Sequence, residues 1–455
     1  MSQAIDLQSG SIGKTLFRYA VPSTMAVWIF ALYTMVDGMF VGRGVGPEAL
    51  AAVNLSMPYI SIMFAISILV TIGSATIVGA KRGEGKHEDA SRLFSSTIYA
   101  LLIFGLLVCT LSYIFIEEIA VILGAQGELI PMVVEYLQTL LLFNTFYLVA
   151  YSMEVFVKVD GFPKLELMVI GMAAVMNILL DYILVIRLGM GLRGAAIATG
   201  CAQMTQATFL LLHFTGKLGK TGSLKFVRVM PKLRELFHFI KIGGPDCVTE
   251  MSAGLILLLF NNMILAYLGT SELSAFSVIG YANNLVLLTM IGLTQGMQPI
   301  VSFLRGRQDY QRISEAVQLT IRIALVICTA AYAGIFFFGQ QLAALFLNDA
   351  ELISLSHQFM KIFCLAFILM GANIVISGFF TALEQPRLAG TLSLMRGGVI
   401  SFILLMTLPR ILGATGIWVV APVSELATFV VGAFLLKRKL DQWKETTMDE
   451  QIAVA

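Results

Sequence analysis

Residues 71–83 read TIGSATIVGAKRG, and residues 294–306 read TQGMQPIVSFLRG. The two stretches align without a gap at an offset of 223 residues (294 − 71), and each is an apolar run that ends in basic residues. Such internal similarity at a fixed distance predicts that the chain contains two copies of one structural plan.

Other landmarks outside these stretches keep nearly the same offset. The matching positions are Pro22 and Pro245, Gly46 and Gly269, and Pro163 and Pro386 at 223, with Gly191 and Gly413 at 222. We therefore expect an N-terminal lobe at 1–216, a cytoplasmic linker at 217–234, and a C-terminal lobe with a short cytoplasmic tail at 235–455. The two copies should run parallel, related by an axis along the membrane normal.

The composition requires a lipid environment. Hydrophobic residues make up 58% of the 455 residues and charged residues 13%, about half the roughly 25% of charged residues in soluble domains. This excludes an ordinary soluble enzyme, a disordered chain and a nucleic-acid binder. Apolar runs long enough to cross a bilayer predict an all-α membrane protein with six transmembrane helices in each of two pseudo-symmetric lobes. The expected spans are 14–40, 50–80, 92–124, 130–157, 163–187, 192–216, 235–265, 273–303, 315–347, 353–383, 387–412 and 414–437.

The positions of the basic residues orient these spans. With the N-terminus in the cytoplasm, 23 Lys and Arg fall in the inside segments and at the inner ends of spans. Only Arg43, Arg187, Arg193 and Arg410 fall on the outside, and Arg322, Lys361 and Arg396 lie within spans. Basic residues concentrate on the cytoplasmic side of membrane proteins. We therefore expect a multi-pass protein of the cytoplasmic membrane with both termini inside.

Several polar residues lie inside the predicted spans, where an ionisable group costs at least a few kcal/mol and indicates a functional site. Asp37 lies near the outer end of the first span. Asn177 and Asp181 lie one turn apart on the fifth span, so they share a helix face, and Thr199 lies at similar depth in the sixth. Oxygen ligands of this kind suit a proton or a small hard cation such as Na⁺.

Two other interpretations of these residues are that they satisfy one another as structural hydrogen-bond partners, or that both acids reach water near the outer interface. The repeat helps to choose between them. Asp37 maps to Phe260, Asn177 to Ile400 and Asp181 to Leu404 at offset 223, and Thr199 maps to Ala421 at 222. A structural requirement of the fold would be expected in both halves, so the asymmetry favours function.

Glu250 lies near the middle of the seventh span. It is either a cavity carboxylate that attracts cationic substrate or a hydrogen-bonded buried glutamic acid. Pro22 and Pro245 each interrupt an early span and are either kinks that move or static packing kinks, and Pro22 is our hinge candidate.

The sequence carries no sign of enzymatic chemistry. We find no HExxH, GxSxG, P-loop or Cys/His cluster. The five cysteines are too scattered for a disulfide framework or a zinc site. We therefore expect no enzyme, no cofactor and no ATP-driven pump.

The chain resembles the multidrug and toxic compound extrusion (MATE) family of secondary transporters, with a likeness to its MepA-like bacterial multidrug exporters. The likeness is carried by Pro22 and by five stretches, which are MVDGMFVGRGVGPEALAAVNLSMP (35–58), GAKRGEGKHEDASR (79–92), DGFPK (160–164), MNILLDYILV (176–185) and GLRGAAIATG (191–200). The resemblance implies two six-helix lobes and export of amphipathic, often cationic drugs in exchange for H⁺ or Na⁺, with antibiotic resistance as the consequence.

The resemblance also assigns roles to residues. The family's N-lobe coupling site, an aspartate on the first helix, an Asn-x-x-x-Asp pair on the fifth and a threonine on the sixth, corresponds to Asp37, Asn177, Asp181 and Thr199. Its bending first-helix proline corresponds to Pro22, and the helix-seven glutamate of NorM-type members to Glu250. NorM-type members also carry an aspartate on helix ten. The polar candidates for it here are Asn373, Ser377 and Glu384, and none of them matches. This favours ion coupling in the N-lobe.

We therefore expect a monomeric secondary antiporter that works by alternating access. Its partners would be small amphipathic or cationic substrates and membrane lipids, with H⁺ or Na⁺ as coupling ion and no nucleic acid. The alternative is a MATE-related exporter or flippase of a dedicated metabolite or lipid-linked precursor. The in-span acids outweigh the in-span basic groups, which argues against an anionic headgroup.

Overall fold

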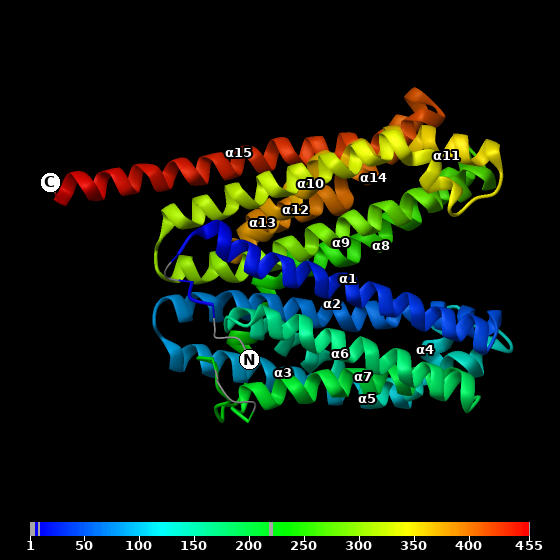
Figure 1. Ribbon diagram of the computed structural model, residues 1–455, viewed down its shortest axis with the longest axis horizontal. Coiled ribbons are helices and arrows are strands. Elements are labelled where there is room, and N and C mark those ends of the chain that lie inside the picture. Colours follow the sequence, from blue (N-terminus) through cyan, green and yellow to red (C-terminus); the bar gives the residue numbers. More distant parts are fainter. Residues whose placement is uncertain (1–4, 8–9, 218–221, 455) are drawn as a thin grey trace. The chain divides into compact units, whose positions relative to one another are not determined.

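The computed structural model describes residues 5–7, 10–217 and 222–454, and all the regular elements it describes are helices (Figure 1). The α-helices are α1 (Ile12–Gly44), α2 (Pro47–Gly83), α3 (His87–Ile114), α4 (Ile116–Ile122), α5 (Leu129–Val159), α6 (Pro163–Asp181), α7 (Gly191–Phe214), α8 (Leu233–Tyr267), α9 (Thr270–Gly306), α10 (Tyr310–Ala344), α11 (Ala350–Phe363), α12 (Phe367–Ala382), α13 (Pro386–Leu394), α14 (Ile400–Leu412) and α15 (Ala414–Val454). Two π-helical segments, Tyr182–Arg187 and Met395–Val399, extend α6 and join α13 to α14.

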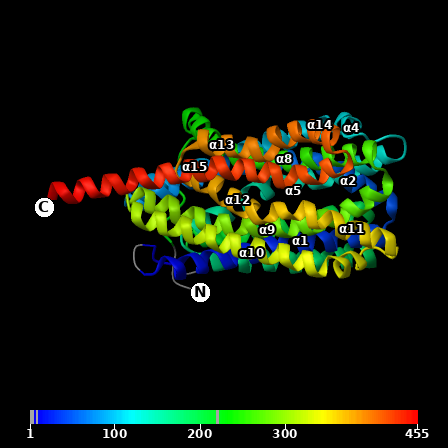
Figure 2. The same cartoon turned by 90° about the horizontal axis from the view of Figure 1, so that it is seen from above.

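Within the described residues, twelve helical segments are long and apolar enough to cross a membrane. They agree with the predicted spans, so the all-α, twelve-span fold class is confirmed. The prediction of one unbroken third helix to residue 124 is wrong, because Phe115 leaves the helical region (φ −104°, ψ 29°) and a separate short helix, α4, follows. The last helix runs past the predicted 437 to Val454, beyond its neighbours in the same half of the chain (Figure 2).

The chain divides into two compact units. The first unit comprises Met1–Gly10 and Val21–Gly243, and the second comprises Ser11–Ala20 and Gly244–Ala455, as far as these residues are described. The boundaries cut α1 and α8 just before Pro22 and Pro245, and they are 223 residues apart (243 − 20), the offset of the sequence repeat.

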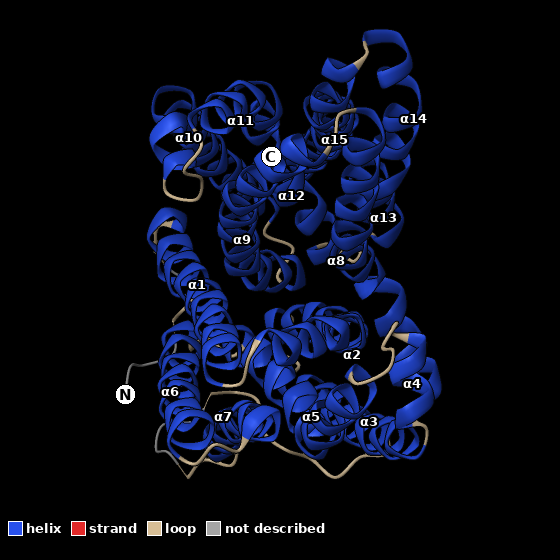
Figure 3. Cartoon of the chain, turned by 90° about the vertical axis from the view of Figure 1, so that its right-hand side faces the viewer, coloured by secondary structure: helices blue, strands red, loops and turns tan. Residues whose placement is uncertain are grey.

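Each unit is built around enclosed helices. In the first unit, 78% of the most apolar window of α2 and 72% of that of α5 is buried, against 33% for α3. Helix α5 packs against α2, α3 and α7, which are seen end-on in Figure 3. In the second unit the corresponding central segment is α11–α12, 72% buried, which packs on α9 and α10.

Close helix crossings explain why two pairs of small residues occupy equivalent positions in the repeat. A Cβ atom at Gly73 on α2 would overlap the carbonyl oxygen of Phe239 on α8, and one at Gly243 would overlap that of Leu69. In the second unit a Cβ at Gly296 on α9 would lie 2.5 Å from the Cα of Ala20 on α1. Gly73 and Gly296 are repeat equivalents, as are Ala20 and Gly243, so both units contain the same tight crossing.

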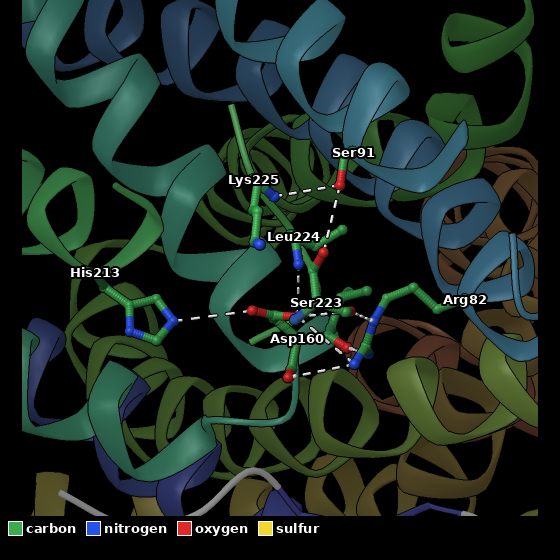
Figure 4. Close-up of polar contacts among 8 residues, drawn as sticks. Arg82, Ser91, Asp160, His213, Ser223, Leu224 and Lys225 are labelled. Carbon is green, nitrogen blue, oxygen red and sulfur yellow. Dashed lines mark hydrogen bonds and ion pairs between the residues drawn. The ribbon is translucent and has the colours of Figure 1, made fainter. Parts of the chain in front are cut away.

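A polar network binds the segment after α7 to the first unit (Figure 4). Residues 218–221 of the expected linker lie outside the described residues, while Ser223 and Leu224 are well placed against Asp160. One oxygen of Asp160 accepts hydrogen bonds from the backbone N–H groups of Ser223 (2.8 Å) and Leu224 (3.2 Å) and from the Ser223 hydroxyl (3.0 Å). Arg82 donates to that hydroxyl (2.6 Å) and lies 3.5 Å from the carboxylate.

Two serines one turn apart on α3 continue this network. Ser91 Oγ accepts from the N–H of Lys225 (3.2 Å), and Ser95 Oγ accepts from that of Val227 (2.9 Å). Both hydroxyls also donate to carbonyl groups of the same segment. These serines provide hydrogen-bond partners for backbone N–H and C=O groups of an irregular segment. Without them those groups would be unpaired.

Candidate functional site

The four residues predicted as a coupling site come together in the first unit. Asp37 lies on α1, Asn177 and Asp181 on α6, and Thr199 on α7. Asn177 donates a hydrogen bond to the Thr199 hydroxyl (3.4 Å), and the carboxyl groups of Asp37 and Asp181 lie within hydrogen-bonding reach of each other. We call these four residues the aspartate cluster.

The local structure of α6 helps to position this cluster. Asp181 is the last residue of the regular α-helix, and the π-helical segment Tyr182–Arg187 starts directly after it. Such wider turns occur often at functional sites. On the neighbouring α5, the buried Tyr136 lies within electrostatic range of both aspartates.

The aspartate cluster is short of hydrogen-bond donors. Asn177 and Asp181 are fully buried and Asp37 is 9% exposed. No donor among the described residues pairs with Asp37 Oδ1, Asn177 Oδ1 or either oxygen of Asp181. Burying unpaired carboxylates is costly unless they are neutralised. These oxygens therefore fit a bound proton or a small hard cation, which prefers oxygen ligands.

A second group of ionisable residues in the first unit escaped the sequence prediction. Lys158 Nζ lies 2.8 Å from Glu166 Oε1, and Ser23 donates to Glu166 Oε2 (3.2 Å). Gln206 donates to Glu154 Oε2 (2.9 Å), and the carboxyl groups of Glu154 and Glu166 lie within hydrogen-bonding reach. We call these five residues the glutamate cluster.

The sequence prediction missed the glutamate cluster because it assigned Lys158 to a loop and gave Glu154 and Glu166 no role. The structure instead places Lys158 in the last turn of α5 and Glu166 in the first turn of α6, each 1% exposed. A usable signal was the spacing of Glu154 and Lys158, which puts an acid and a base on one helix face.

The second unit holds a third group, in which an acid has a basic partner. Arg396 donates to Glu425 Oε1 (2.9 Å), and Asn373 donates to Glu425 Oε2 (2.6 Å) and to its carbonyl oxygen (2.8 Å). Arg396 belongs to the π-helical segment Met395–Val399. We call Asn373, Arg396 and Glu425 the arginine cluster. The other two candidates for a helix-ten acid have different partners, since Ser377 contacts Ser393 (3.0 Å) and Glu384 pairs with Arg305 (2.5 Å).

Glu250 lies on α8 in the second unit and takes no part in the hydrogen bonds of the arginine cluster. Residue 250 is exposed on the second unit, and its role as a cavity carboxylate or a hydrogen-bonded glutamic acid stays a prediction. Nearby Asp246 is paired, because Thr381 donates to it at 2.9 Å and Gln298 at 3.5 Å.

Twelve spans in two repeated sets of helices, with unpaired acids inside one set, define a multi-pass membrane protein of the transporter class. Residues 22–183 and 247–407 each match the MatE family, one match in each half of the repeat. The chain belongs to the MatE family. Its membership confirms the expected transporter class and the expectation that the protein is not an enzyme.

Known relatives cover almost the whole chain. The multidrug export protein MepA of Staphylococcus saprophyticus is 25% identical over 438 residues, which is 95% of this chain and 96% of the relative. The protein of the same name from Staphylococcus aureus strain MSSA476 is 24% identical over 441 residues, with the same coverage.

Solved structures share the fold. An outward-facing multidrug resistance MATE transporter of the MOP superfamily superposes with a TM-score of 0.89 at 20% identity, covering 98% of this chain and 99% of the other. A MOP superfamily transporter from Pyrococcus furiosus, described as having a binding pocket of reversed polarity, superposes at 0.88 with 20% identity and the same coverage.

Proposed function

We propose that this protein is a secondary active antiporter of the cytoplasmic membrane. It exports amphipathic, cationic drugs or toxic metabolites in exchange for H⁺ or Na⁺, works as a monomer and has both termini in the cytoplasm. The observation that carries the proposal is the aspartate cluster, whose buried acceptors have no donors within the described structure. The MepA relatives, which are named multidrug export proteins, support the substrate class.

The aspartate cluster supplies the coupling step. When it faces outside, Asp37 and Asp181 accept the ion, which removes the cost of two close buried carboxylates. The loaded state then favours the conformation that releases drug outward, because an ion shifts an equilibrium only by its differential affinity for the two states. Release of the ion inside restores the negative charge, and the protein can bind the next cation.

Pro22 is the proposed point of bending in α1. The boundary between the two units falls between Ala20 and Val21. Ser23, the residue after Pro22, donates a hydrogen bond to Glu166 of the glutamate cluster. Proline removes one helical hydrogen bond at such a position. The chain on either side of Pro22 therefore belongs to different units, which suits a hinge.

The proposal is tested by drug uptake into inside-out proteoliposomes with a pH gradient and a Na⁺ gradient imposed separately. We expect one of the two gradients to drive uptake, and Asp37→Asn to abolish it. The matched control is Glu117→Gln, the same change of charge at an exposed acid on α4. Uptake that needs ATP without any gradient, or lipid scrambling without drug transport, would refute the antiport.

A further inference from the structure

The glutamate cluster contains one carboxylate more than its basic group can neutralise. Lys158 forms an ion pair with Glu166 at 2.8 Å, and both side chains are almost fully buried. Glu154 accepts a hydrogen bond from the neutral amide of Gln206 at 2.9 Å and interacts electrostatically with Lys158, while its carboxyl group approaches that of Glu166. Two carboxyl groups can form a hydrogen bond with each other only when one of them carries a proton. The cluster is therefore built to hold a single proton at Glu154.

Polar side chains on α7 connect this cluster to the aspartate cluster. Thr199 belongs to the aspartate cluster and Gln206 to the glutamate cluster, with Gln203 between them on the same face at i+4 and i+7 spacing. Thr199 and Gln206 are about 10 Å apart along the helix axis. The side-chain oxygen of Gln203 is buried without a donor among the described residues. A polar stripe with an open acceptor thus runs from one cluster to the other.

A tyrosine on α1 lies near residues of both clusters. Tyr33 lies one turn before Asp37, and it is within electrostatic range of both Asp37 and Glu154. Its hydroxyl group can donate and accept a hydrogen bond. The charged and polar groups that face Glu154 are therefore Tyr33 from α1, Lys158 from its own helix, Glu166 from α6 and Gln206 from α7.

We propose that Glu154 is a second proton-carrying residue of the transport cycle, which takes the proton from the aspartate cluster and passes it toward the cytoplasmic end of α5. Glu154 first gives up its proton toward the cytoplasmic end of α5. The O–H bond on Asp37 or Asp181 then breaks and a new O–H bond on Glu154 forms, so the aspartate cluster regains its negative charge. The inference rests on the proposed antiport and narrows its coupling ion to H⁺.

The buried lysine is the reason for choosing H⁺ over Na⁺. A Na⁺ ion that left along this route would find a single carboxylate, Glu154, because Lys158 already neutralises Glu166, whereas a hard cation prefers several oxygen ligands. A proton moves instead by exchanging O–H bonds between carboxyl groups and needs no room for an ion. The glutamate cluster therefore suits a proton better than a metal cation.

The test uses the full-length protein in proteoliposomes with an internal pH indicator. We expect Glu154→Gln to slow drug uptake driven by a pH gradient by roughly tenfold or more, since a positioned proton carrier contributes at least that much. Drug-for-drug exchange, which moves no net proton, should stay at the wild-type rate. Glu154→Asp should restore part of the lost rate, and Tyr33→Phe should slow uptake to a lesser degree.

The controls separate the possible failures. Glu117→Gln should behave as wild type, and the melting temperature of each purified variant should show that it is folded. A Glu154→Gln variant with the wild-type rate and pH profile would overturn the role of Glu154. Uptake driven by Na⁺ alone would overturn it as well but leave the antiport standing, whereas wild-type protein that responds to neither gradient would overturn the antiport itself.

Discussion

The aspartate cluster of the first unit and the arginine cluster of the second unit differ in one decisive respect. In the arginine cluster, Glu425 has a basic partner at 2.9 Å and an amide donor at 2.6 Å. In the aspartate cluster, Asp37 and Asp181 face each other with acceptor oxygens left over. The first arrangement supplies its own cation from Arg396, and we propose that the second takes one from outside the chain.

The repeat shows that neither cluster is a by-product of the fold. Asn373 and Arg396 correspond to Ala150 and Ala173 at offset 223, and Glu425 to Gln203 at 222. In the other direction Asp37 corresponds to Phe260, whose ring packs 5.6 Å from both Phe276 and Phe363. The same backbone position thus carries a carboxylate in one unit and belongs to an aromatic core in the other. The duplicated helices are shared, while the ionisable residues are specific to each unit.

The largest expected effect is a difference in stability between variants of the arginine cluster and of the aspartate cluster. Glu425→Gln leaves Arg396 as an unpaired, mostly buried charge, and we expect a loss of about 3 kcal/mol or more. Asp181→Asn removes an acid that has no donor, so it should leave stability unchanged or raise it. Thermal unfolding of both purified variants measures the difference.

The double variant Arg396→Met/Glu425→Gln is the matched control for this prediction. It should recover most of the lost stability, because no buried charge remains without a partner. Equal melting temperatures for Glu425→Gln and Asp181→Asn would show that the two clusters do not differ as described.

A smaller loss of stability should appear in both units when the tight helix crossings are overpacked. Gly73→Ala and Gly296→Ala each place a methyl group where a neighbouring backbone already lies, and we expect a loss of about 1–3 kcal/mol from such overpacking. Gly254→Ala on α8, with no atom within 4 Å of the added group, is the control and should be neutral or stabilising. If only one of the two variants is destabilised, the repeat equivalence of the crossings is wrong.

The smallest effect should appear at the segment after α7. Ser91→Ala removes the acceptor of the Lys225 N–H group, which costs about 1 kcal/mol. Ser277→Ala should cost less, because that exposed hydroxyl bonds only to a carbonyl of its own helix. Hydrogen exchange at Lys225 would report the loss directly, and unchanged protection there would contradict the network.

Hydropathy and charge were sufficient to predict the spans, because membrane helices must be long and apolar. Asp37, Asn177, Asp181 and Thr199 could be predicted because the acids are conspicuous inside apolar runs. Glu166 could not, since it lies near a span end beside Lys164 and reads as solvated. Glu425 lies in the middle of the last span and was overlooked, although it is as conspicuous there as the aspartates are in theirs. Only the tertiary fold brings Glu425 to Arg396, 29 residues away. The break at Phe115 has no proline or glycine beside it, so composition alone did not reveal it.

The most direct test of the central claim is the number of cations released when purified protein in detergent binds a cationic drug. H⁺ is followed with an indicator dye in weak buffer, and Na⁺ with an ion-selective electrode. We expect release of about one cation per drug by wild type and by Arg396→Met/Glu425→Gln, and no release by Asp37→Asn/Asp181→Asn. Wild-type release from that aspartate double variant would contradict the claim that the first unit carries the coupling ion.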